Sequence, residues 1–404
     1  MKVLHLNQSD IKGGAAIAAY RLHKSLLSQN IDSEFWVDKK FSNDPTVKLK
    51  LNFIERSIRK IVSWSSKKLI KVIGIESPSY FNFGIFGSPW IRYLNNSDAD
   101  IIHLHWLGNE ILSIKQINKI KKPCIVTLHD EWLLGDGFHL NLYELSPKKN
   151  NRIVNIFMNY ACSYRSRYHN KRLGLVAPSS FMARLVDDHP VFKKNKLRTI
   201  GHPILATDWN PITKIEAKKK IGVPQNSFSI LFSCFGGLED VNKGFDDFCG
   251  AVQQFVHLNP NVDLCLIIIG NFTELQIKNI GAPSVLLGPI NTKIDLIEAY
   301  CASDVVIIPS KYESFGLVAQ EVCMLGIPIV AYEGTGLTDF VMHKANGYLA
   351  KRFDYKDLAV GLNFWNRKTS DSLFNSNKAI LNAYTPDKVA DAHISFYKEV
   401  LSLS

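Results

Sequence analysis

Residues 305–321 read VVIIPSKYESFGLVAQE, and this stretch decides the fold expected for the second half of the chain. Its four β-branched residues predict a buried strand that ends at Pro309. We expect a helix to begin near Ser314, whose hydroxyl group can cap the first turn. A buried strand followed at once by a helix is typical of a parallel sheet with helices on both faces.

The start of this expected helix is a candidate anion site. Backbone N–H groups of Phe315, Gly316 and Leu317 would point out of the first turn, where the helix dipole favours negative charge. Gly316 has no side chain, so its backbone can approach a ligand closely. The pattern therefore predicts a site for a diphosphate group.

Two carboxylates flank the candidate site. Glu313 comes just before the helix and is expected to face a ligand cleft. Glu321 lies on the apolar stripe that Val318, Val322 and Leu325 form at helical spacing. A carboxylate on that side needs polar partners, and sugar hydroxyl groups would supply them. The alternative is a glutamate that reaches solvent or pairs with a buried base.

The alternation of strand and helix continues in both directions along the chain. The expected strands are Lys2–Leu6, Ser33–Val37, Ile101–Leu104, Cys124–Leu128, Gly174–Ala177, Ser229–Ser233, Leu264–Ile269, Val285–Leu287, Val305–Pro309 and Ile329–Ala331. The proline-rich stretch Ile200–Pro224 is interpreted as a linker, and a last helix is expected over Lys388–Leu403. We therefore predict two doubly wound α/β domains facing each other across a cleft, residues 1–200 and 201–385, followed by a helix in residues 386–404.

Length, composition and charge agree with two globular domains. The chain has 404 residues, 46% of them hydrophobic and 21% charged, which excludes a disordered or fibrous protein. Residues 1–200 carry 31 Lys and Arg against 16 Asp and Glu, a net charge of +15. Residues 201–404 carry 17 against 21, a net charge of −4. The asymmetry favours an anionic partner for the first half, either nucleic acid, a membrane surface or a phosphorylated substrate.

Other global features exclude several classes of protein. The seven cysteines are widely spaced and include no C-x-x-C pair, so neither a disulfide framework nor a zinc site is expected. The N-terminus turns polar within a few residues, which argues against a signal peptide. The longest apolar run, Leu264–Ile269, is too short to cross a bilayer. We expect a cytoplasmic protein that is at most peripheral at the inner face of the cell membrane.

A basic helical insertion interrupts the alternation at about residues 50–95. Within it, Glu55–Val72 is expected to be a helix or helix pair that interleaves apolar residues and Trp64 with cations. The cations are Arg56, Arg59, Lys60, Lys67, Lys68 and Lys71. Such a helix can lie on an anionic membrane with its apolar face down. The alternative is a surface helix that packs on its own domain. The charge also suits nucleic acid, but no nucleic-acid motif accompanies it.

Two motifs in the first half stand where parallel strands end. Gly13 and Gly14 precede a helix, where their backbone can approach a phosphate. The dinucleotide fingerprint G-x-G-x-x-G is absent, which disfavours a nicotinamide enzyme. His129 and Asp130 follow the strand Cys124–Leu128, so His129 can hydrogen-bond a sugar or the reacting centre, or be structural.

The sequence predicts no metal site. His103 and His105 lie two apart on one strand without a third ligand at useful spacing, so we interpret them as packing or cleft-lining residues. Asp98 and Asp100 imitate a D-x-D metal motif, but they precede their strand, where a turn is expected.

A glycine-rich loop carries the clearest candidate cation. Gly236, Gly237 and Gly244 surround Lys243 after the strand Ser229–Ser233. A lysine there can neutralise a diphosphate leaving group in a partly desolvated cleft. The alternative is an exposed loop lysine.

Taken together, these residues resemble the retaining glycosyltransferases of family four, which have the GT-B fold. The motifs of the second half follow one another in family order: Leu287-Gly288-Pro289, Ala299–Asp304, the E-x7-E pair Glu313 and Glu321, Gly326–Val330 and Asn346–Leu349. In the first half, Gly13–Ala16, His103–Trp106 and Thr127–Asp130 are similar to a subgroup common in bacterial surface-polysaccharide clusters.

The resemblance implies transfer of a sugar from a nucleotide-diphospho-sugar, bound by the second domain, to an acceptor bound by the first. The acceptor would be a glycan or a polyprenyl-diphosphate-linked sugar in O-antigen, capsule or exopolysaccharide synthesis, and nucleic acid is not an expected partner. The resemblance also implies that the C-terminal helix crosses back to the first domain. Retention is commonly described as attack on the leaving group's own face, with the diphosphate as base, so no metal or other cofactor is expected.

The resemblance also assigns roles to residues. Glu313 would hold the hydroxyl groups of the donor sugar, Glu321 would hold those of the ribose, and His129 would lie near the reacting carbon. The expected catalytic residues are therefore His129, Glu313 and Lys243. The diphosphate and donor would be held by Gly14, Gly237, Lys243, Ser314, Phe315, Gly316 and Leu317. Gly13, His105 and Asp130 would lie on the acceptor side.

Two departures from the family pattern and two rival functions accompany this interpretation. Asn242 stands where the subgroup often has arginine, and Gly137-Phe138-His139 replaces a cysteine-bearing segment, so a metal-binding variant of that loop is lost. One rival is a nucleotide-sugar epimerase or hydrolase with the same donor site. The other is a non-catalytic protein that binds anionic polymers, and the inward carboxylate Glu321 argues against it.

Overall fold

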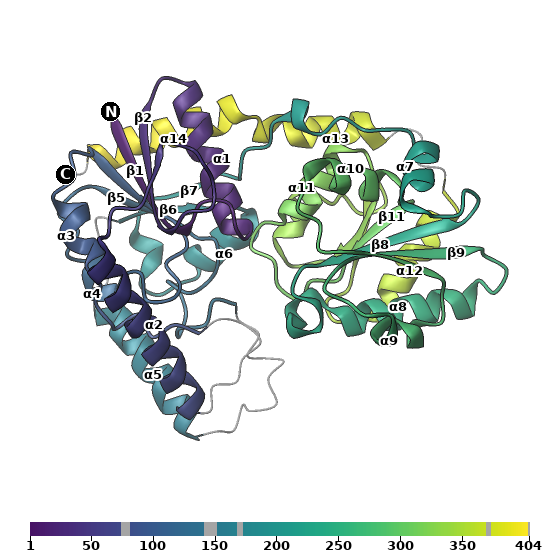
Figure 1. Ribbon diagram of the computed structural model, residues 1–404, viewed down its shortest axis with the longest axis horizontal. Helices are drawn as coiled ribbons and strands as arrows, with labels where there is room; N and C mark the ends of the chain where they lie inside the picture. The colour runs from purple at the N-terminus through teal and green to yellow at the C-terminus, as the bar shows by residue number, and fades with distance from the viewer. Residues whose placement is uncertain (74–80, 141–151, 168–172, 369–372, 403–404) are drawn as a thin grey trace. The chain divides into compact units, whose positions relative to one another are not determined.

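The computed structural model describes residues 1–73, 81–140, 152–167, 173–368 and 373–402. The chain divides into two compact units (Figure 1). The first unit comprises Met1–Pro203 together with Pro386–Ser404, and the second comprises Ile204–Thr385. In sequence, the second unit is thus inserted between the body of the first unit and its last helix.

The first unit contains a sheet of seven parallel strands in the order β3-β2-β1-β4-β5-β6-β7. The strands are β1 (Lys2–Ser9), β2 (Asp32–Lys39), β3 (Val47–Lys48), β4 (Ile101–Leu104), β5 (Cys124–Thr127), β6 (Leu173–Ala177) and β7 (Leu197–Thr199). The sheet grows outward in both directions from β1 and β4. In doubly wound sheets, ligands bind at the carboxyl ends of the strands beside such a reversal.

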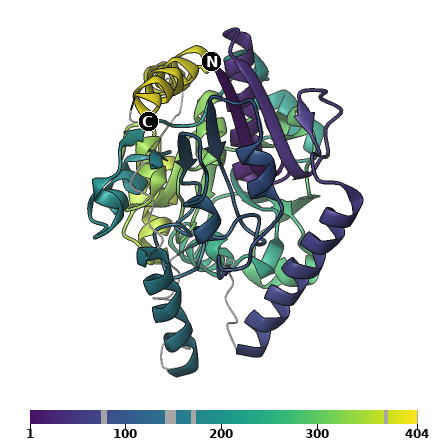
Figure 2. The ribbon, with the colours of Figure 1, turned by 90° about the vertical axis from the view of Figure 1, so that its left-hand side faces the viewer.

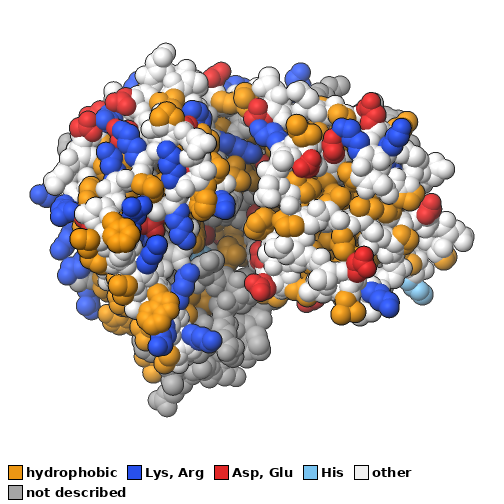
Figure 3. Space-filling view, in the orientation of Figure 1, with side chains coloured by type: hydrophobic (Ala, Val, Ile, Leu, Met, Phe, Trp, Pro, Cys, Tyr) orange, Lys and Arg blue, Asp and Glu red, His pale blue; other side chains and the backbone are white. Residues whose placement is uncertain are grey.

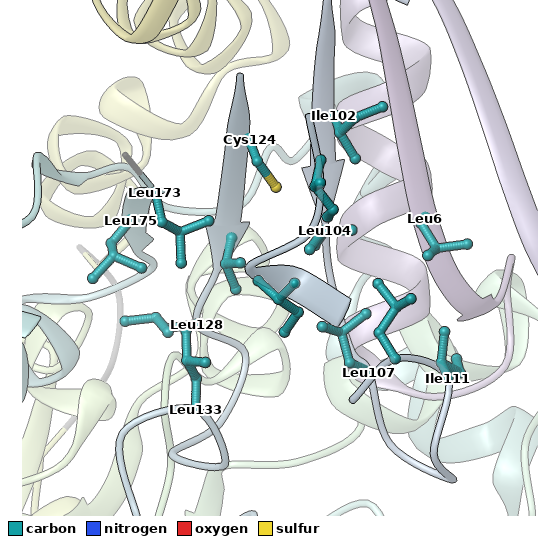
Figure 4. Close-up of a cluster of buried hydrophobic side chains, with 14 of the residues drawn as sticks. Leu6, Ile102, Leu104, Leu107, Ile111, Cys124, Leu128, Leu133, Leu173 and Leu175 are labelled. Carbon is teal, nitrogen blue, oxygen red and sulfur yellow. The ribbon is translucent and has the colours of Figure 1, made fainter. Parts of the chain in front are cut away.

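The two faces of this sheet differ in character. Side chains two apart on a strand share a face, and one face is apolar along β4, β5 and β6. Figure 4 labels members of its core, among them Leu6, Ile102, Leu104 and Leu128. The opposite face starts with Val3, Ile101 and Ile125, which are also in an apolar cluster. Further along the same strands, it carries histidines instead, as described below.

Helices from both ends of the chain cover the face that carries the histidines. They are α1 (Gly14–Ser28) and α14 (Pro386–Leu401), which contact each other and share one apolar cluster with the sheet. This contact confirms that the C-terminal helix returns to the first domain. The other helices of the unit are α2 (Phe53–Ile73), α3 (Trp90–Asn95), α4 (Ile114–Ile117), α5 (Arg152–Arg167) and α6 (Ser180–Asp187). Figure 2 shows α2 and α5 as two separate arms at one end of the unit.

The second unit contains a sheet of six parallel strands in the order β10-β9-β8-β11-β12-β13. The strands are β8 (Phe228–Cys234), β9 (Leu264–Gly270), β10 (Ser284–Gly288), β11 (Val305–Ile308), β12 (Ile329–Tyr332) and β13 (Gly347–Ala350). The helices are α7 (Lys214–Ile221), α8 (Phe245–Leu258), α9 (Glu274–Ile277), α10 (Lys293–Cys301), α11 (Leu317–Met324), α12 (Tyr355–Asn366) and α13 (Leu373–Leu381). An apolar cluster lies on each face of the sheet, which explains why β9 is apolar and buried along its whole length.

All ten expected strands are present, and the expected doubly wound α/β architecture is confirmed for each unit. The expectation that Ile200–Pro224 is a linker is wrong, because most of it belongs to the second unit. Ile204 and Trp209 are buried in the core of that unit. The rest of the stretch contains α7, which a capping box at Thr213 begins.

Candidate functional site

In the second unit, Lys243 and Glu313 form an ion pair near the carboxyl ends of β8 and β11. The ammonium nitrogen of Lys243 lies 3.0 Å from Oε2 of Glu313. Both side chains are partly exposed, so a ligand can reach them. The structure therefore brings together two of the three expected catalytic residues, although 70 residues separate them in the sequence.

The loop around Lys243 is held in place by close backbone contacts. Gly244 has a positive φ of 68°, and a Cβ on it would lie 2.2 Å from the carbonyl oxygen of Pro309. The side-chain amide of Asn242 donates to the carbonyl oxygen of Tyr312 at 2.9 Å, and the N–H of Lys311 donates to the carbonyl oxygen of Asn242 at 2.8 Å. Asn242 thus ties Lys243 to the loop that carries Glu313.

The charge of Lys243 is stabilised by its surroundings. Burial alone would lower the pKa of its ammonium group, because burial disfavours the charged form. The carboxylates of Glu313 and Asp240 outweigh this effect and raise the pKa above its ordinary value. Lys243 is therefore a permanent cation at neutral pH.

The helix after Glu313 begins later than expected. Helix α11 starts at Leu317, and Gly316 precedes it in the left-handed conformation with a φ of 100° and no side-chain cap. The expectation that Ser314 caps this helix is therefore wrong, because the left-handed turn at Gly316 separates them. The first helical bond runs from the N–H of Gln320 to the carbonyl oxygen of Gly316 at 3.0 Å.

This later start changes which N–H groups form the anion site. Leu317, Val318 and Ala319 precede the first helical bond, so their N–H groups have no acceptor within the helix. Of the three expected donors, only that of Leu317 lies in the helical turn. Phe315 instead inserts its ring into the core, where it packs edge-on against Phe340 with ring centroids 4.9 Å apart.

A second glycine holds the Glu313 loop in place. The N–H of Gly336 donates to the carbonyl oxygen of Glu313 at 2.7 Å. A Cβ on Gly336 would lie 2.6 Å from the carbonyl carbon and oxygen of Ser314, so only glycine fits there without a shift. Gly237 is a third such position, since a Cβ on it would lie 2.3 Å from the carbonyl oxygen of Asn271.

Glu321 is buried on α11, with 9% of its surface exposed, as its place on the apolar stripe predicts. It lies close to Tyr300, whose pKa is raised well above its ordinary value by burial and by the negative charge of Glu321. A buried carboxylate beside a hydroxyl group suits hydrogen bonding to a polar ligand.

In the first unit, the expected phosphate-binding glycines lie at the start of α1. Gly13 and Gly14 are exposed, and Gly13 precedes the helix with a φ of 95°. A Cβ on Gly13 would meet no atom within 4 Å, so glycine is favoured there by its backbone conformation and not by a close contact. Among the described residues, no side chain caps α1.

His105, His129 and Asp130 come together at the carboxyl ends of β4 and β5. A small pocket is lined by all three, together with residues on either side of them. Nδ1 of His105 lies 3.1 Å from Nε2 of His129. Asp130 accepts from the N–H of Trp132 at 3.0 Å and pairs with Nδ1 of His139 at 2.5 Å. Burial lowers the pKa of His129 to about 4, against the opposing charge of Asp130, so His129 is neutral at pH 7.

Sequence spacing missed a third histidine beside His103 and His105. His5, on β1, is paired in register with His103 on β4, and one nitrogen from each of the three rings lies within 4.8 Å of the others. The parallel pairing of the first and third expected strands was the signal that could have found it. Asp98 and Asp100 instead bind Lys2, whose side chain and backbone nitrogens lie 2.8 and 2.7 Å from their carboxylates.

Family models match both units. A model described as "Glycosyltransferase Family 4" matches residues 12–205, and one described as "Glycosyl transferases group 1" matches residues 229–364. The two matches cover the Gly13 and His129 motifs of the first unit and the Lys243, Glu313 and Glu321 motifs of the second.

Relatives and solved structures extend over almost the whole chain. An "uncharacterized 41.2 kDa protein in cps region" of Klebsiella pneumoniae is 24% identical, over 98% of this chain and 99% of its own. The crystal structure of Alr3699/HepE of Anabaena in complex with UDP and glucose is 18% identical, with a TM-score of 0.65 over 99% of this chain and 100% of that one. The crystal structure of WaaG, described as a glycosyltransferase involved in lipopolysaccharide biosynthesis, is 13% identical, with a TM-score of 0.57 over 96% and 98%. The likeness to these structures shows the GT-B fold.

Proposed function

The chain belongs to the family 4, or group 1, retaining glycosyltransferases, and on this premise we propose that it builds a bacterial surface polysaccharide. The donor is a nucleotide-diphospho-sugar, and the acceptor is a glycan or a lipid-linked sugar. The relative encoded in a capsule region of Klebsiella pneumoniae supports this assignment. UDP is the first nucleotide to test, because structures of two of the similar proteins contain it.

The observation that carries the donor assignment is the Lys243–Glu313 pair beside the start of α11. A diphosphate bears more negative charge than one carboxylate, so it competes with Glu313 for the ammonium group of Lys243. The N–H groups at the start of α11 favour the same anion. Once displaced, the Glu313 carboxylate can accept hydrogen bonds from sugar hydroxyl groups, while Glu321 serves the ribose.

The first unit supplies the remaining assigned residues. Gly14 would bind the diphosphate, and His129 would lie near the reacting carbon. Gly13 and Asp130 would face the acceptor, whereas His105, expected on that side, is buried and contacts His129. The acceptor oxygen forms a bond to the sugar carbon on the face from which the diphosphate oxygen departs, and the diphosphate takes the acceptor's proton. The residues then stabilise charge and position the reactants, and none acts as a nucleophile.

Nucleotide sugars and a glycan acceptor provide the test. We expect at least one UDP-sugar to raise the melting temperature of the protein, because a ligand that binds only the folded state stabilises it. An extract of lipid-linked acceptors should then receive the sugar in retained configuration. Consumption of the donor without an acceptor would identify an epimerase or hydrolase instead. The absence of stabilisation by any nucleotide sugar would contradict the donor assignment.

We also propose that helix α2 attaches the enzyme to an anionic membrane. The burial pattern of α2 is the reverse of that of an ordinary surface helix. Its buried residues are Glu55, Arg59 and Ser66, whereas apolar side chains face solvent. The exposed apolar residues, each at least 39% exposed, are Phe53, Ile54, Ile58, Ile61, Trp64, Leu69 and Val72. Figure 3 shows apolar and basic side chains interspersed over the region where α2 lies in Figure 1.

Polar contacts hold the inner face of α2 on its own unit. Arg59 pairs with Asp38 at 3.3 Å and donates to the backbone of Asn109 and Glu110, so it is a structural residue and not a surface cation. Ser66 donates to the carboxylate of Glu110 at 3.1 Å. These polar contacts hold α2 on its unit together with Ile70 and Ile73, which pack against a small apolar cluster. The exposed apolar residues listed above lie outside that packing.

The chemistry of the outer face fits anionic lipid. Lys60, Lys67, Lys68 and Lys71 are exposed, and the Lys68 ammonium lies 5.1 Å from the centre of the Trp64 ring. Apolar residues flanked by lysines and a tryptophan suit the boundary between lipid headgroups and acyl chains. Among the described residues, no helix is long and apolar enough to cross a bilayer.

Vesicle binding tests this proposal. Each lysine near an anionic surface is worth about 1 kcal/mol, so changing these four lysines to glutamine should weaken binding to phosphatidylglycerol vesicles by roughly a hundredfold or more. Binding by the wild type should also fall as salt rises. Changing Lys119, Lys121, Lys193 and Lys194, four exposed lysines elsewhere in the first unit, is the matched control. Equal binding by the two variants would refute a role for α2.

A further inference from the structure

Three imidazoles form a continuous hydrogen-bonded chain inside the first unit. Nδ1 of His5 lies 2.9 Å from Nε2 of His105, and Nδ1 of His105 lies 3.1 Å from Nε2 of His129. This hydrogen-bonded chain runs from His5, in the middle of β1, to His129, which follows β5. The proposed function places His129 near the reacting carbon. His5 and His105 are buried, and His129 is half-buried at the pocket.

The sheet itself builds this chain. His5 and His103 are paired in register on neighbouring parallel strands. His105 lies two residues beyond His103, and the N–H of His105 still donates to the carbonyl oxygen of Leu6 at 3.0 Å. His129 lies two residues beyond Thr127, the last residue of β5. All four histidines therefore project from one face toward the carboxyl edge.

The three rings are neutral. Burial lowers the pKa of each, to about 4 for His129, and neighbouring histidines lower it further for His5 and His105. The carboxylate of Asp130 raises the pKa of His129, but it is itself paired with His139. The other titratable groups that face the chain are His23 from α1, His103 from β4, His202, and His393 and Tyr397 from α14.

Neutrality leaves two arrangements of hydrogen atoms. In each contact one nitrogen must donate and the other must accept, and a neutral imidazole has only one N–H. If Nε2 of His129 carries the hydrogen, donation runs inward and ends with an N–H on Nε2 of His5. If donation runs outward, His5 and His105 each donate from Nδ1, and the hydrogen of His129 is on Nδ1.

The inner end of the chain decides between the two arrangements. Nε2 of His5 is buried and has no hydrogen-bond partner among the described residues. The inward arrangement would leave a buried N–H without an acceptor there, whereas the outward one leaves a lone pair. Buried N–H groups without a partner are the rarer and costlier of the two, so donation runs outward.

We propose that His5 and His105 are positioning residues that fix His129 as a neutral imidazole with its hydrogen on Nδ1. The consequence for catalysis rests on the proposed function. His129 then carries its hydrogen on Nδ1 and accepts at Nε2 from His105, so it cannot remove the acceptor's proton. That proton is left to the departing diphosphate.

A metal ion is the competing interpretation of the same histidines. His103 argues against it, because its Nδ1 lies 2.7 Å from the hydroxyl oxygen of Tyr397 and its Nε2 lies 2.7 Å from that of Thr127. An ion at His5, His103 and His105 would have to replace these contacts.

Nuclear magnetic resonance of the full chain, labelled with ¹⁵N in histidine, tests the proposal without reference to activity. At pH 7.5 we expect His129 to show a protonated Nδ1 and a bare Nε2. His105→Asn, whose amide nitrogen lies as many bonds from Cα as Nδ1 does, should preserve this state. His105→Gln and His105→Phe, which remove the donor at that place, should abolish it. His23→Gln is the control, because His23 binds Ser33 and Thr46 outside the chain.

Several results would overturn the proposal. One is a hydrogen on Nε2 of His129 in the wild type. Another is the same Nδ1 tautomer in both His105→Gln and His105→Phe. A third is stoichiometric binding of Zn²⁺ that shifts the signals of His5, His103 and His105 together.

Measurements of kcat test the role of the His129 tautomer in catalysis separately from the proposed function. With a nucleotide sugar shown to be the donor, His105→Phe should lower kcat on the order of tenfold or more, with the Kd for UDP unchanged and activity largely restored in His105→Asn. Unchanged kcat in a variant that has lost the Nδ1 tautomer would overturn the role in catalysis. If no nucleotide sugar binds, the proposed function fails, while the tautomer measurement still stands on its own.

Discussion

The two units have similar parallel sheets but opposite electrostatics at the carboxyl ends of their strands. The second unit carries a lysine and a carboxylate there, at 3.0 Å, beside the open N–H groups of a helix. The first unit carries buried imidazoles that are neutral at pH 7. Ten of the twelve histidines of the chain lie in the first unit. The two units thus share an architecture but differ in the side chains at the carboxyl ends of their strands. Those of the second unit suit an anion, and those of the first unit suit hydrogen bonding by neutral groups.

Of all the changes considered, lowering the pH should produce the largest difference in stability between the two units. His23, His129 and His393 each have a pKa of about 4 in the folded state against 6.5 when unfolded. Below pH 6.5 the unfolded chain therefore binds protons that the folded chain does not, and the free energy of unfolding falls as the pH drops toward 4. At pH 5 these three groups together remove about 6 kcal/mol, a large share of a domain's stability.

Hydrogen exchange followed peptide by peptide measures this difference. Between pH 7.5 and pH 5, after correction for the intrinsic exchange rate, β1, β4 and β5 should lose most of their protection. Strands β8 and β11 should keep theirs, because the two histidines of the second unit, His257 and His343, are exposed. Equal loss of protection in both sheets would break the comparison.

Removing the cation of the second edge should have the next largest effect. Lys243→Ala should lower kcat by about 10² to 10³, the usual effect of deleting one donor to a developing charge, and should weaken UDP binding. The fold should persist, because the side chain is partly exposed. The control is Lys293→Ala, which removes an exposed lysine paired with Asp208 in the same unit. Near-normal turnover in Lys243→Ala would place the donor site elsewhere.

Glu313→Ala should act on sugar binding more than on nucleotide binding. Its loss removes the acceptor proposed for the sugar hydroxyl groups, so turnover should be abolished with the fold intact. The affinity for free UDP should stay the same or rise, because Lys243 loses its competing partner. Calorimetry with UDP and with a UDP-sugar distinguishes these effects. A parallel loss of both affinities would contradict the assigned role.

Two glycine substitutions in the second unit test what holds the loop of Lys243 in place. Gly244→Ala should destabilise the protein by about 3 kcal/mol, because it combines a left-handed backbone with a Cβ 2.2 Å from the carbonyl oxygen of Pro309. Gly222→Ala shares the left-handed backbone but meets no atom within 4 Å, so it should cost only about 1 kcal/mol. Urea denaturation measures both. Equal costs would mean that the contact with Pro309 does not fix Lys243.

The strands could be predicted because each is a short apolar run with a polar or glycine-bearing boundary. The structure adds β3, β7 and β13, which sequence analysis missed. β3 has only two residues, and Leu197–Thr199 is exposed or half-buried, so it lacks the apolar signal. β13 begins at Gly347, and a strand pattern does not favour glycine. Glycine is required there because a Cβ on Gly347 would lie 2.3 Å from the carbonyl oxygen of Ile329.

The candidate site could be predicted in part. The identity of Lys243, Glu313 and Glu321 follows from motifs, but their contact depends on Gly244 and Asn242, whose roles are visible only in three dimensions. The cap assigned to Ser314 failed because propensity cannot foresee the left-handed turn at Gly316. The link between His5 and His105 spans 100 residues, and only the pairing of β1 with β4 brings them together.

The place of α14 has a consequence for the order in which the protein folds during synthesis. Phe396, Tyr397 and Val400 complete the apolar cluster that covers Val3 and Ile125. The ribosome makes these residues only after it has made the whole second unit. The second unit can therefore fold first, while the first unit waits with one face of its sheet uncovered. A truncation before Pro386 would spare the unit next to the cut and expose the core of the unit that begins the chain.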